Sequence, residues 1–512
     1  MEREREFSED IATTDDAEGS PFVRMTPEEG AEQPASVPSF FSRGTAELPL
    51  DTEEPKDSMS AFIHRTTSTA IEDEEEAADD GYILPRAPKN FSEVGLSKAF
   101  LTDLALKIIH YSGTPSMAQL VRRLGLGNEI VAQLIQALTE EGFIGILSQS
   151  DLYTGNYRYR LSERGQKRVA EALERSRYAG PAPVTAEQYT DVMRKLLDHK
   201  QETNSRAHIK TILNELVLSH EVSDALARAL FSGKSVIIHG PSGDGKTVLL
   251  ERYAEDMGGF SVVPYAIYAY GQVIRVFDQS IHRTIEPGSP EAPPDDGRRD
   301  QRWVTVKRPA IVLGAEMDRE ALELGYDPSA RFYQAPPHIK AQNGALIIDD
   351  FGRQRIETRD LLTRYVIPLE RGWDSMTLQT GEKLAVPFQT QLLFSTNMRV
   401  KDLADEALLR RILYKVNMPN PDRASFAEII RRVCLQKAVR VEDGALDYAV
   451  ERLYSYPGLK PRGSYARDIL DILIESASYD GREPVLDRDS FDRVFKLFLA
   501  NELETEEADD EF

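Results

Sequence analysis

The chain has 512 residues, 41% of them hydrophobic, with a formal net charge of −23 and a single cysteine, Cys434. That length allows roughly two to four domains with at least one large core. The sequence contains no run of 18 apolar residues and no apolar segment after its charged start, which excludes a membrane span and a signal peptide. One cysteine cannot form an internal disulfide, so we expect a cytoplasmic protein in which Cys434 is a buried thiol.

The negative charge lies at the two ends of the chain. Segment 1–80 holds 23 Asp and Glu residues against 6 Lys and Arg, and 502–512 adds 7 acids and no base, so the 421 residues between them carry a net charge of +1. Both ends lack long apolar runs, so they cannot bury enough surface to offset the loss of chain entropy. We therefore predict disordered acidic tails over 1–82 and 501–512.

Alternating and helical patterns predict a small mixed domain over 83–178. We expect helices over 98–111, 116–124 and 128–141, strands over 143–148 and 157–161 around a Gly155-Asn156 turn, and a last helix over 162–175. This order resembles a winged-helix domain, and the segment 157–165 is similar to the wing strand and final helix of bacterial winged-helix proteins.

The sequence leaves two kinds of partner possible for this domain, a protein or a nucleic acid. Most winged-helix domains lay their third helix in the DNA major groove, where basic and amide side chains read the base edges. The corresponding segment 128–141 carries three acids and no base, which favours a protein partner. Phosphate contact through the wing is the alternative, because bases gather around it: Arg122, Arg123, Arg158, Arg160, Lys167 and Arg168.

A short proline-rich segment follows the first domain. Gly180-Pro181-Ala182-Pro183 predicts an extended linker, because two prolines in four residues favour a stiff spacer. Helical patterns over 186–201 and 209–231 and an apolar strand over 235–239 come next.

The segment after that strand reads Gly240-Pro241-Ser242-Gly243-Asp244-Gly245-Lys246-Thr247, and a helix begins at Val248. It fits the phosphate-binding loop pattern G-x-x-x-x-G-K-[ST] and has the strand and helix that this pattern requires. The glycines let backbone N–H groups turn toward phosphates, and the helix N-terminus adds a positive dipole end. We predict binding of ATP or GTP, with Lys246 at the β- and γ-phosphates and Thr247 on Mg²⁺.

A second strand ends in two carboxylates. The apolar run 345–348 predicts a buried parallel strand, and Asp349 and Asp350 follow it at the end where ligands of α/β sheets bind. We expect Asp349 to hold Mg²⁺ through water, and Asp350 to orient or deprotonate the attacking water.

Further polar residues follow along the chain. The apolar strand over 391–397 ends in a polar pair, Thr396-Asn397, which can reach the γ-phosphate or the water. The helix 403–412 ends in Arg410 and Arg411, and an arginine there can be delivered to a neighbour's γ-phosphate. Arg467 lies in a helical C-terminal region.

With these motifs, residues 205–500 resemble the AAA+ ATPases. Lys246 matches their Walker A lysine, Asp349-Asp350 their Walker B pair, Asn397 sensor 1, Arg410-Arg411 the arginine-finger region and Arg467 the sensor-2 arginine of the lid. The resemblance implies an α/β nucleotide-binding domain over 184–418, a parallel sheet with helices on both faces, and a helical lid over 419–500. It also implies ATP and Mg²⁺ as cofactors and assembly of identical subunits into a ring or arc.

Other segments bear on the type of AAA+ protein. Segment 375–386 predicts a hairpin, similar to the pre-sensor-1 hairpin of MoxR-type ATPases, enhancer-binding activators and replicative helicases. The activators' G-A-F-T-G-A loop is absent from the sequence, which disfavours their function. Segment 287–294 predicts a surface loop. Tyr268 and Tyr270 either grip a client in a central pore or pack within a sheet or core.

The Walker B pair departs from the family's usual Asp-Glu, because Asp350 is one methylene shorter than glutamate. Either hydrolysis is slow, as in nucleotide switches, or the backbone brings Asp350 closer to the water. The sequence therefore predicts an oligomeric, chaperone-like ATPase that remodels a protein client. A slow nucleotide-controlled scaffold or signalling switch is the alternative, and a DNA-associated ATPase the second alternative.

Overall fold

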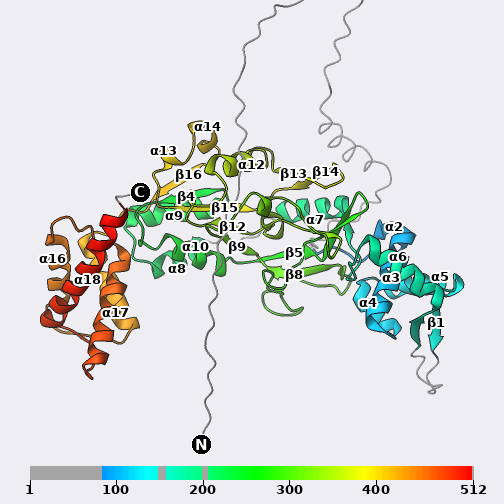
Figure 1. Ribbon diagram of the computed structural model, residues 1–512, viewed down its shortest axis with the longest axis horizontal. Coiled ribbons are helices and arrows are strands. Elements are labelled where there is room, and N and C mark those ends of the chain that lie inside the picture. The colour runs from blue at the N-terminus through cyan, green and yellow to red at the C-terminus, as the bar shows by residue number, and fades with distance from the viewer. Residues whose placement is uncertain (1–83, 148–156, 199–205, 510–512) are drawn as a thin grey trace, which may run out of the picture. The chain divides into compact units, whose positions relative to one another are not determined.

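The computed structural model describes residues 84–147, 157–198 and 206–509 (Figure 1). The predicted tail over 1–82 and the Gly155-Asn156 turn lie outside the described residues. From Leu84 onward the described residues belong to one compact unit. Among them no helix is both long and apolar enough to cross a bilayer.

The first part of the chain consists of helices and a two-stranded sheet. Its elements are α2 (Phe91–Val94), α3 (Lys98–Ser112), α4 (Met117–Leu124), α5 (Asn128–Glu140), β1 (Ile144–Leu147), β2 (Arg158–Leu161) and α6 (Glu163–Arg175). Ser97, Ser116 and Ser162 begin α3, α4 and α6, because each side chain accepts a hydrogen bond from a first-turn N–H. The predicted helices and strands are confirmed here to within one residue; the winged-helix assignment stays a prediction.

The proline-rich segment is extended, as predicted, but it packs against the first domain and does not separate that domain from the rest. Ala182 is 1% exposed, and its N–H donates to the carbonyl of Leu124 at 2.7 Å. Tyr178 Oη donates to the carbonyl of Pro181, also at 2.7 Å. The extended backbone that proline favours lies against the apolar core of the first domain, and β3 (Val184–Thr185) continues it into a sheet.

That sheet was not predicted. Its order is β10-β11-β7-β6-β3, with β6 (Ala266–Ala269), β7 (Gln272–Arg275), β10 (Gly325–Asp327) and β11 (Phe332–Gln334). Beside it in the chain, β5 (Phe260–Pro264) pairs with β8 (Trp303–Lys307). These strands have two to five residues and are separated by long loops. They are too short for the alternation of apolar and polar residues to be recognised in the sequence. Segment 287–294 is largely exposed, as predicted for a surface loop.

The two tyrosines considered for a client pore belong to this sheet. Tyr268 lies in β6, and its ring centroid is 4.5 Å from that of Phe100. Tyr270 and Gly271 have φ values of 49° and 77°, as a two-residue hairpin turn between β6 and β7 requires. Tyr270 Oη donates to the carbonyl of Lys383 at 3.2 Å. The structure therefore favours packing for Tyr268, whereas Tyr270 is 49% exposed at the tip of the hairpin.

The central sheet has five parallel strands in the order β16-β4-β15-β12-β9. They are β4 (Val236–His239), β9 (Ala310–Leu313), β12 (Ala345–Ile348), β15 (Gln391–Thr396) and β16 (Tyr414–Asn417). Val236 and Ile238 pack in the core that contains α8 (Arg206–Glu215), α9 (His220–Phe231) and α10 (Lys246–Glu255), whereas Ile237 packs on the side of α12 (Thr358–Arg371). The predicted α/β fold, a parallel sheet with helices on both faces, is confirmed.

Two predicted elements beside this sheet can be compared with the structure. The single helix expected over 209–231 is divided into α8 and α9, because the Ser219 side chain caps α9 by accepting from the N–H of Val222. The predicted hairpin is present as β13 (Trp373–Thr377) and β14 (Lys383–Pro387), which pair antiparallel. It packs against α7 (Ala186–Asp198).

The C-terminal part is helical, as predicted for a lid, with α15 (Arg423–Gln436), α16 (Ala445–Ser455), α17 (Gly463–Tyr479) and α18 (Arg488–Asp509). The helices α16, α17 and α18 lie side by side (Figure 1) around a common apolar core, where Cys434 is buried as expected. Because α18 runs to Asp509, residues 501–509 are helical, whereas we predicted disorder from 501. Glu, Leu and Ala favour helix, and extending an existing helix avoids the cost of nucleation.

Candidate nucleotide-binding site

The phosphate-binding loop joins β4 to α10 at the carboxyl end of the central sheet. Gly240, Gly243 and Gly245 have φ values of 151°, 85° and 85°, which only glycine adopts freely. A Cβ atom on Gly240 would lie 2.0 Å from the carbonyl oxygen of Met418, so the loop passes this neighbour too closely for any side chain. The glycine spacing of the motif is thus a backbone requirement.

Lys246 is held inside this loop. Its side chain is buried, and Nζ donates to the carbonyl of Gly240 at 2.9 Å and also to that of Pro241. Burial lowers the pKa of Lys246, while the carboxylates of Asp244, Asp350 and Asp349 act in the opposite direction. A cation with only backbone carbonyls and nearby carboxylates around it is suited to exchange those carbonyls for anionic oxygens.

Thr247 and Asp349 are 102 residues apart in sequence and touch in the structure. Thr247 Oγ1 lies 2.9 Å from Asp349 Oδ1 and 3.0 Å from Oδ2. Asp349 is fixed by its backbone, since its N–H donates to Leu313 at 2.9 Å and its carbonyl accepts from Gln354 Nε2 at 2.7 Å. One hydroxyl beside one carboxylate fits Mg²⁺, which keeps several waters and takes its other ligands from phosphates.

The described residues contain no group of three or more His, Cys, Asp or Glu side chains that could hold a metal by itself. Any Mg²⁺ at Thr247 and Asp349 would take its remaining ligands from water or from a nucleotide. This agrees with a site that binds the metal together with the phosphates.

Asp350 has an unusual backbone. Its φ is 48°, in the left-handed region, and its side chain is exposed. Aspartate tolerates this region better than most residues, but at a cost of up to about 1 kcal/mol relative to glycine. The next residue anchors the turn, because Phe351 is buried and its N–H donates to the carbonyl of Ser395 at 2.6 Å. The backbone turn thus presents Asp350 at the surface beside Asp349.

Strand β15 lies between β4 and β12 in the central sheet. Asn397, at its end, therefore lies between the phosphate-binding loop and the Asp349-Asp350 pair. Asn397 is half-buried. The preceding Thr396, the other member of the predicted polar pair, contacts both the phosphate-binding loop and the turn after Asp350: its carbonyl accepts from the N–H of Gly240 at 3.3 Å, and its hydroxyl donates to the carbonyl of Phe351 at 2.7 Å. Its position at the end of an apolar strand was the available signal.

The paired arginines have different surroundings. Little of the helix predicted over 403–412 is present: α13 (Val400–Leu403) ends where it was expected to begin, and α14 (Glu406–Leu409), capped by Asp405, ends before the arginines. Arg410 and Arg411 therefore follow the helix in a turn, and their predicted place on a helix is wrong. Arg411 Nε donates to Glu370 at 2.7 Å, and its guanidinium also bonds the carbonyl of Ala407. Arg410 is exposed and has no ion pair with any residue in the described ranges. Arg410 is therefore the arginine available to a second molecule.

The lid reaches the phosphate-binding loop through the start of α17. The N–H of Gly463 donates to Asp244 Oδ1 at 2.9 Å, and that of Ser464 donates to the carbonyl of Gly243 at 2.8 Å. Arg467 lies four residues after Gly463 and is exposed. The structure thus brings α17 to the loop and leaves the Arg467 side chain in solvent.

A cavity of about 140 Å³ lies beside the loop. Three parts of the chain line it: the turn between α8 and α9, the loop itself, and the lid with the segment before it. The lining residues are Val217, Leu218, Ser219, Val222, Asp244, Met418, Pro419, Asn420, Pro421, Asp422, Ser425, Ile429 and Gly463. Its size is close to that of the engineered cavity of about 150 Å³ that holds one aromatic ring. No local pattern predicts it, because its walls come from distant segments.

The first domain has an acidic face on α5 and exposed basic residues near β2. The exposed positions of α5 include Glu129, Gln133, Gln136 and Glu140. Of the basic residues near β2, Arg158 donates to the carbonyl of Thr114 and Arg168 pairs with Asp103 at 2.8 Å, whereas Arg122, Arg123, Arg160 and Lys167 are exposed. The exposed face of the third helix is therefore acidic, as the sequence indicated.

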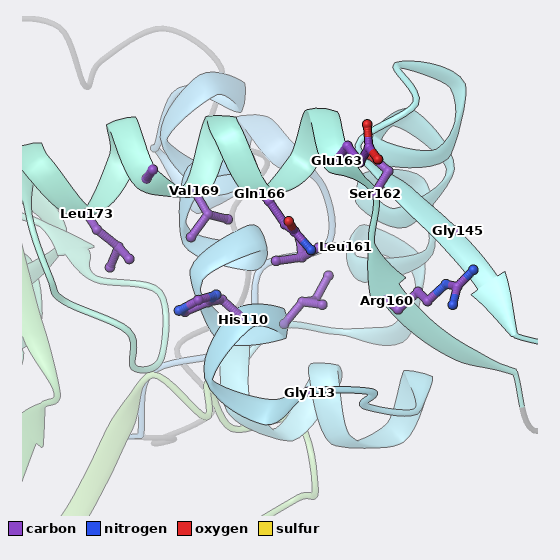
Figure 2. A pocket seen from close by; sticks show the side chains of 12 residues that line it. His110, Gly113, Gly145, Arg160, Leu161, Ser162, Glu163, Gln166, Val169 and Leu173 are labelled. Atoms are coloured by element: carbon purple, nitrogen blue, oxygen red, sulfur yellow. The ribbon is translucent and has the colours of Figure 1, made fainter.

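This domain also has a hollow of about 760 Å³ between α3, β2 and α6. Figure 2 shows His110, Leu161 and Gln166 directed toward it, and Arg160 also lines it. It contains none of the residues predicted to bind nucleotide or metal.

Comparisons with known proteins cover parts of the chain. Residues 422–497 match a family model described as a domain of unknown function (DUF8689). No curated protein matches the sequence. Among solved structures, NtrX from Brucella abortus in complex with ATP is similar at 14% identity and a TM-score of 0.34, over 64% of this chain and 61% of that chain. A RuvB mutant from Thermotoga maritima is similar at 14% identity and a TM-score of 0.33, over 56% of this chain and 72% of that chain.

The chain thus spans less than two thirds of the NtrX chain that it matches. At these TM-scores neither likeness bears on what the chain does. The geometry of the site has to be weighed by itself.

Proposed function

We propose that this chain is an AAA+ ATPase that binds ATP with Mg²⁺ and hydrolyses it. The observation that carries the proposal is the contact between Thr247 and Asp349, 2.9 Å apart, beside the buried Lys246. A glycine loop, a lysine, a hydroxyl and a carboxylate at the same edge of a parallel sheet are the groups that position phosphates and their metal.

Each group has a defined task in this proposal. Lys246 leaves the carbonyls of its own loop and binds the β- and γ-phosphates, while the loop N–H groups hold them in place. Thr247 and Asp349 would hold Mg²⁺, and the ion would supply positive charge against the charge that develops on the phosphates. Asp350, presented by its left-handed backbone, orients or deprotonates the attacking water, and Asn397 holds that water or the γ-phosphate. The nucleoside enters the neighbouring cavity.

Assembly and client belong to the same proposal. The exposed Arg410 supports delivery of an arginine to the nucleotide of a neighbouring subunit, and hence a homo-oligomeric ring or arc. The acidic face of α5 supports a protein partner for the first domain. We infer a chaperone-like remodeller of a protein client, with the MoxR-like hairpin group as its nearest type within the superfamily.

A slow nucleotide switch is the second candidate, and one observation favours it. The Asp350 side chain is one methylene shorter than glutamate and sits on a left-handed turn whose next residue is anchored in the core. If this turn cannot move, the carboxylate stays far from the water, and ATP binding rather than turnover would control the assembly.

The test is ATP binding by titration calorimetry and turnover by phosphate release. Lys246→Ala should weaken ATP binding by about thirtyfold or more, since removing one partner of a buried charge contact costs about 2–5 kcal/mol. Lys234→Ala, which removes an exposed lysine just before β4, is the matched control and should bind like the parent. Normal binding and turnover by Lys246→Ala would exclude the proposed site.

Action between subunits has its own test. Arg410→Ala and Lys246→Ala proteins should each be inactive alone, and mixed assemblies should recover some turnover, because one subunit supplies the arginine and the other the intact loop. Co-assembly without recovery would exclude delivery in trans.

A further inference from the structure

The contact between the lid and the phosphate-binding loop uses the first two amides of a helix. Gly463 and Ser464 open α17, so their N–H groups have no partner within the helix. Both are satisfied by the loop, through Asp244 Oδ1 at 2.9 Å and the Gly243 carbonyl at 2.8 Å. The P-loop therefore caps α17 from outside the lid.

The two backbones fit closely at this point. A Cβ atom on Gly243 would lie 2.5 Å from Ser464 Oγ, and one on Gly463 would lie 3.1 Å from the Gly243 carbonyl oxygen. Glycine on both sides is what allows the approach. The contact thus depends on the shape of both chains as well as on the two hydrogen bonds.

Burying the carboxylate of Asp244 at this contact costs free energy. Its Oδ2 atom is buried and has no hydrogen-bond partner among the described residues. Burial raises the pKa of Asp244, while the Gly463 hydrogen bond, Lys246 and Arg462 act in the opposite direction. A carboxylate in a loop built for phosphates also repels the ligand. The positive end of the α17 dipole, which stabilises a carboxylate, offsets part of this cost.

We propose that Asp244 is a positioning residue that docks the lid onto the phosphate-binding loop through the N-terminus of α17. Docking places Arg467, one helical turn after Gly463 on the same helix face, over the loop side of the lid. It also closes the nucleoside cavity, because Asp244 and Gly463 both line that cavity together with Ile429 of the lid.

The proposal gives residues 422–497, the segment that matches the domain of unknown function, a role in this chain: they supply one wall of the cavity beside the phosphate-binding loop. The docking itself needs no nucleotide. Only the positioning of Arg467 rests on the proposed ATPase function.

The first experiment follows hydrogen exchange of the peptide around Gly463 and Ser464 in nucleotide-free, full-length protein. Asp244→Ala should speed exchange there by about fivefold, the equivalent of losing one helix cap. Asp244→Asn keeps an oxygen that can accept from Gly463 and should exchange close to the parental rate. Glu251→Ala, an exposed acid on α10, is the control and should change nothing.

Unchanged exchange in Asp244→Ala, or an Asp244→Asn protein as fast as Asp244→Ala, would overturn the docking role. Thermal unfolding of each variant checks that the fold is intact. Because these measurements contain no nucleotide, they decide the docking even if the chain proves unable to bind ATP.

The second experiment measures KM and kcat for ATP in Asp244→Ala, Arg467→Ala and the double variant. If Asp244 acts by placing Arg467, the double variant should lose no more than the more damaged single variant, and Asp244→Asn should recover most of the loss. If the losses in kcat/KM of the two single variants multiply in the double variant, Asp244 does not act by placing Arg467. The docking role of Asp244 would then rest on the hydrogen-exchange result.

Discussion

Two regions of the molecule show opposite ways of using polar residues. The nucleotide edge, defined by Lys246, Thr247, Asp349, Asp350 and Asn397, lies at the ends of central strands and has its polar groups half-buried or exposed, except Lys246. The second-sheet core, the apolar cluster that includes Val262, Ile274 and Tyr333, is bordered by polar residues that are fully buried and paired. Polar side chains serve chemistry in the first region and cohesion in the second. Substitutions should therefore separate turnover from stability.

The largest expected effect is the loss of turnover when Arg410 is removed, because we propose that Arg410 acts on the nucleotide of a second subunit. Arg410→Ala should lower turnover by about a thousandfold or more while ATP affinity stays nearly unchanged, because the arginine acts in the transition state. Arg411→Ala is the matched variant and should lose less, since Glu370 already binds this guanidinium within the same chain. Single-turnover phosphate release measures both. Equal losses would show that the two arginines act together.

The next effect belongs to the border of the second-sheet core. Arg302 and Asp300 form a salt bridge at most 3% exposed, and Arg302 Nη1 also donates to the carbonyl of Val94 at 3.1 Å. Arg302→Ala leaves a buried carboxylate unpaired and should lower the free energy of unfolding by about 3–5 kcal/mol.

ATP affinity of the protein that remains folded should not change in Arg302→Ala. Arg299→Ala removes a more exposed pair with Asp295 and should cost less than about 1 kcal/mol in urea unfolding. A shift in ATP affinity with Arg302→Ala would mean that the two regions are coupled.

Asp350 tests the carboxylate at the nucleotide edge. Asp350→Asn should slow hydrolysis by about a hundredfold or more and keep ATP bound, with no loss of thermal stability. Asp350→Glu should raise the turnover number if the shorter side chain holds the water too far away. A slower glutamate variant would indicate a site built around aspartate, and parental hydrolysis by Asp350→Asn would exclude Asp350 as the catalytic carboxylate.

The smallest effect is a pH dependence of stability in the second region. His338 is fully buried, with Nε2 2.7 Å from Asp374 Oδ2, and burial lowers the pKa of His338 below its usual value. The folded protein keeps this imidazole neutral, whereas the unfolded chain takes up a proton near pH 6.5. The stability from His338 is therefore complete above about pH 6.5 and declines as the pH falls below it, by up to about 1.4 kcal/mol per pH unit.

Urea unfolding between pH 7 and pH 5 should show this slope in the parent and a shallower one in His338→Gln. His282, whose pKa burial also lowers, is present in both proteins, so the difference in slope reports on His338 alone. Identical slopes would show that the pKa of His338 is the same in the folded and unfolded states.

The nucleotide edge could be predicted because its signals are local. A buried parallel strand reads as a continuous apolar run, and residues such as Thr247, Asp349 and Asn397 follow directly where ligands bind. What the sequence could not show is which distant groups meet. The Asp244 contact with Gly463 spans 219 residues, and the Arg411 pair with Glu370 spans 41.

The second sheet could not be predicted for a different reason. Its strands are short, and their order follows from pairing between distant segments, as when Tyr333 of β11 lies beside Ile274 of β7. No window of sequence contains that pairing. Three helices of the first domain, α3, α4 and α6, begin at serine caps that the sequence shows, and α5 was found from its apolar period alone. The helix over 501–509 was missed because it continues α18, which is held in place by contacts with α16 and α17.

The packed segment around Ala182 determines how this protein can be divided for experiments. A protease needs several residues of free backbone, and here the N–H of Ala182 is bonded and Pro183 is buried, so limited digestion should spare this position although its composition suggests an open hinge. A fragment that begins at residue 184 would leave Ala266 and Val273, which now pack against the helices of the first domain, facing water. Such a fragment should aggregate, and a truncation series is better begun near residue 84.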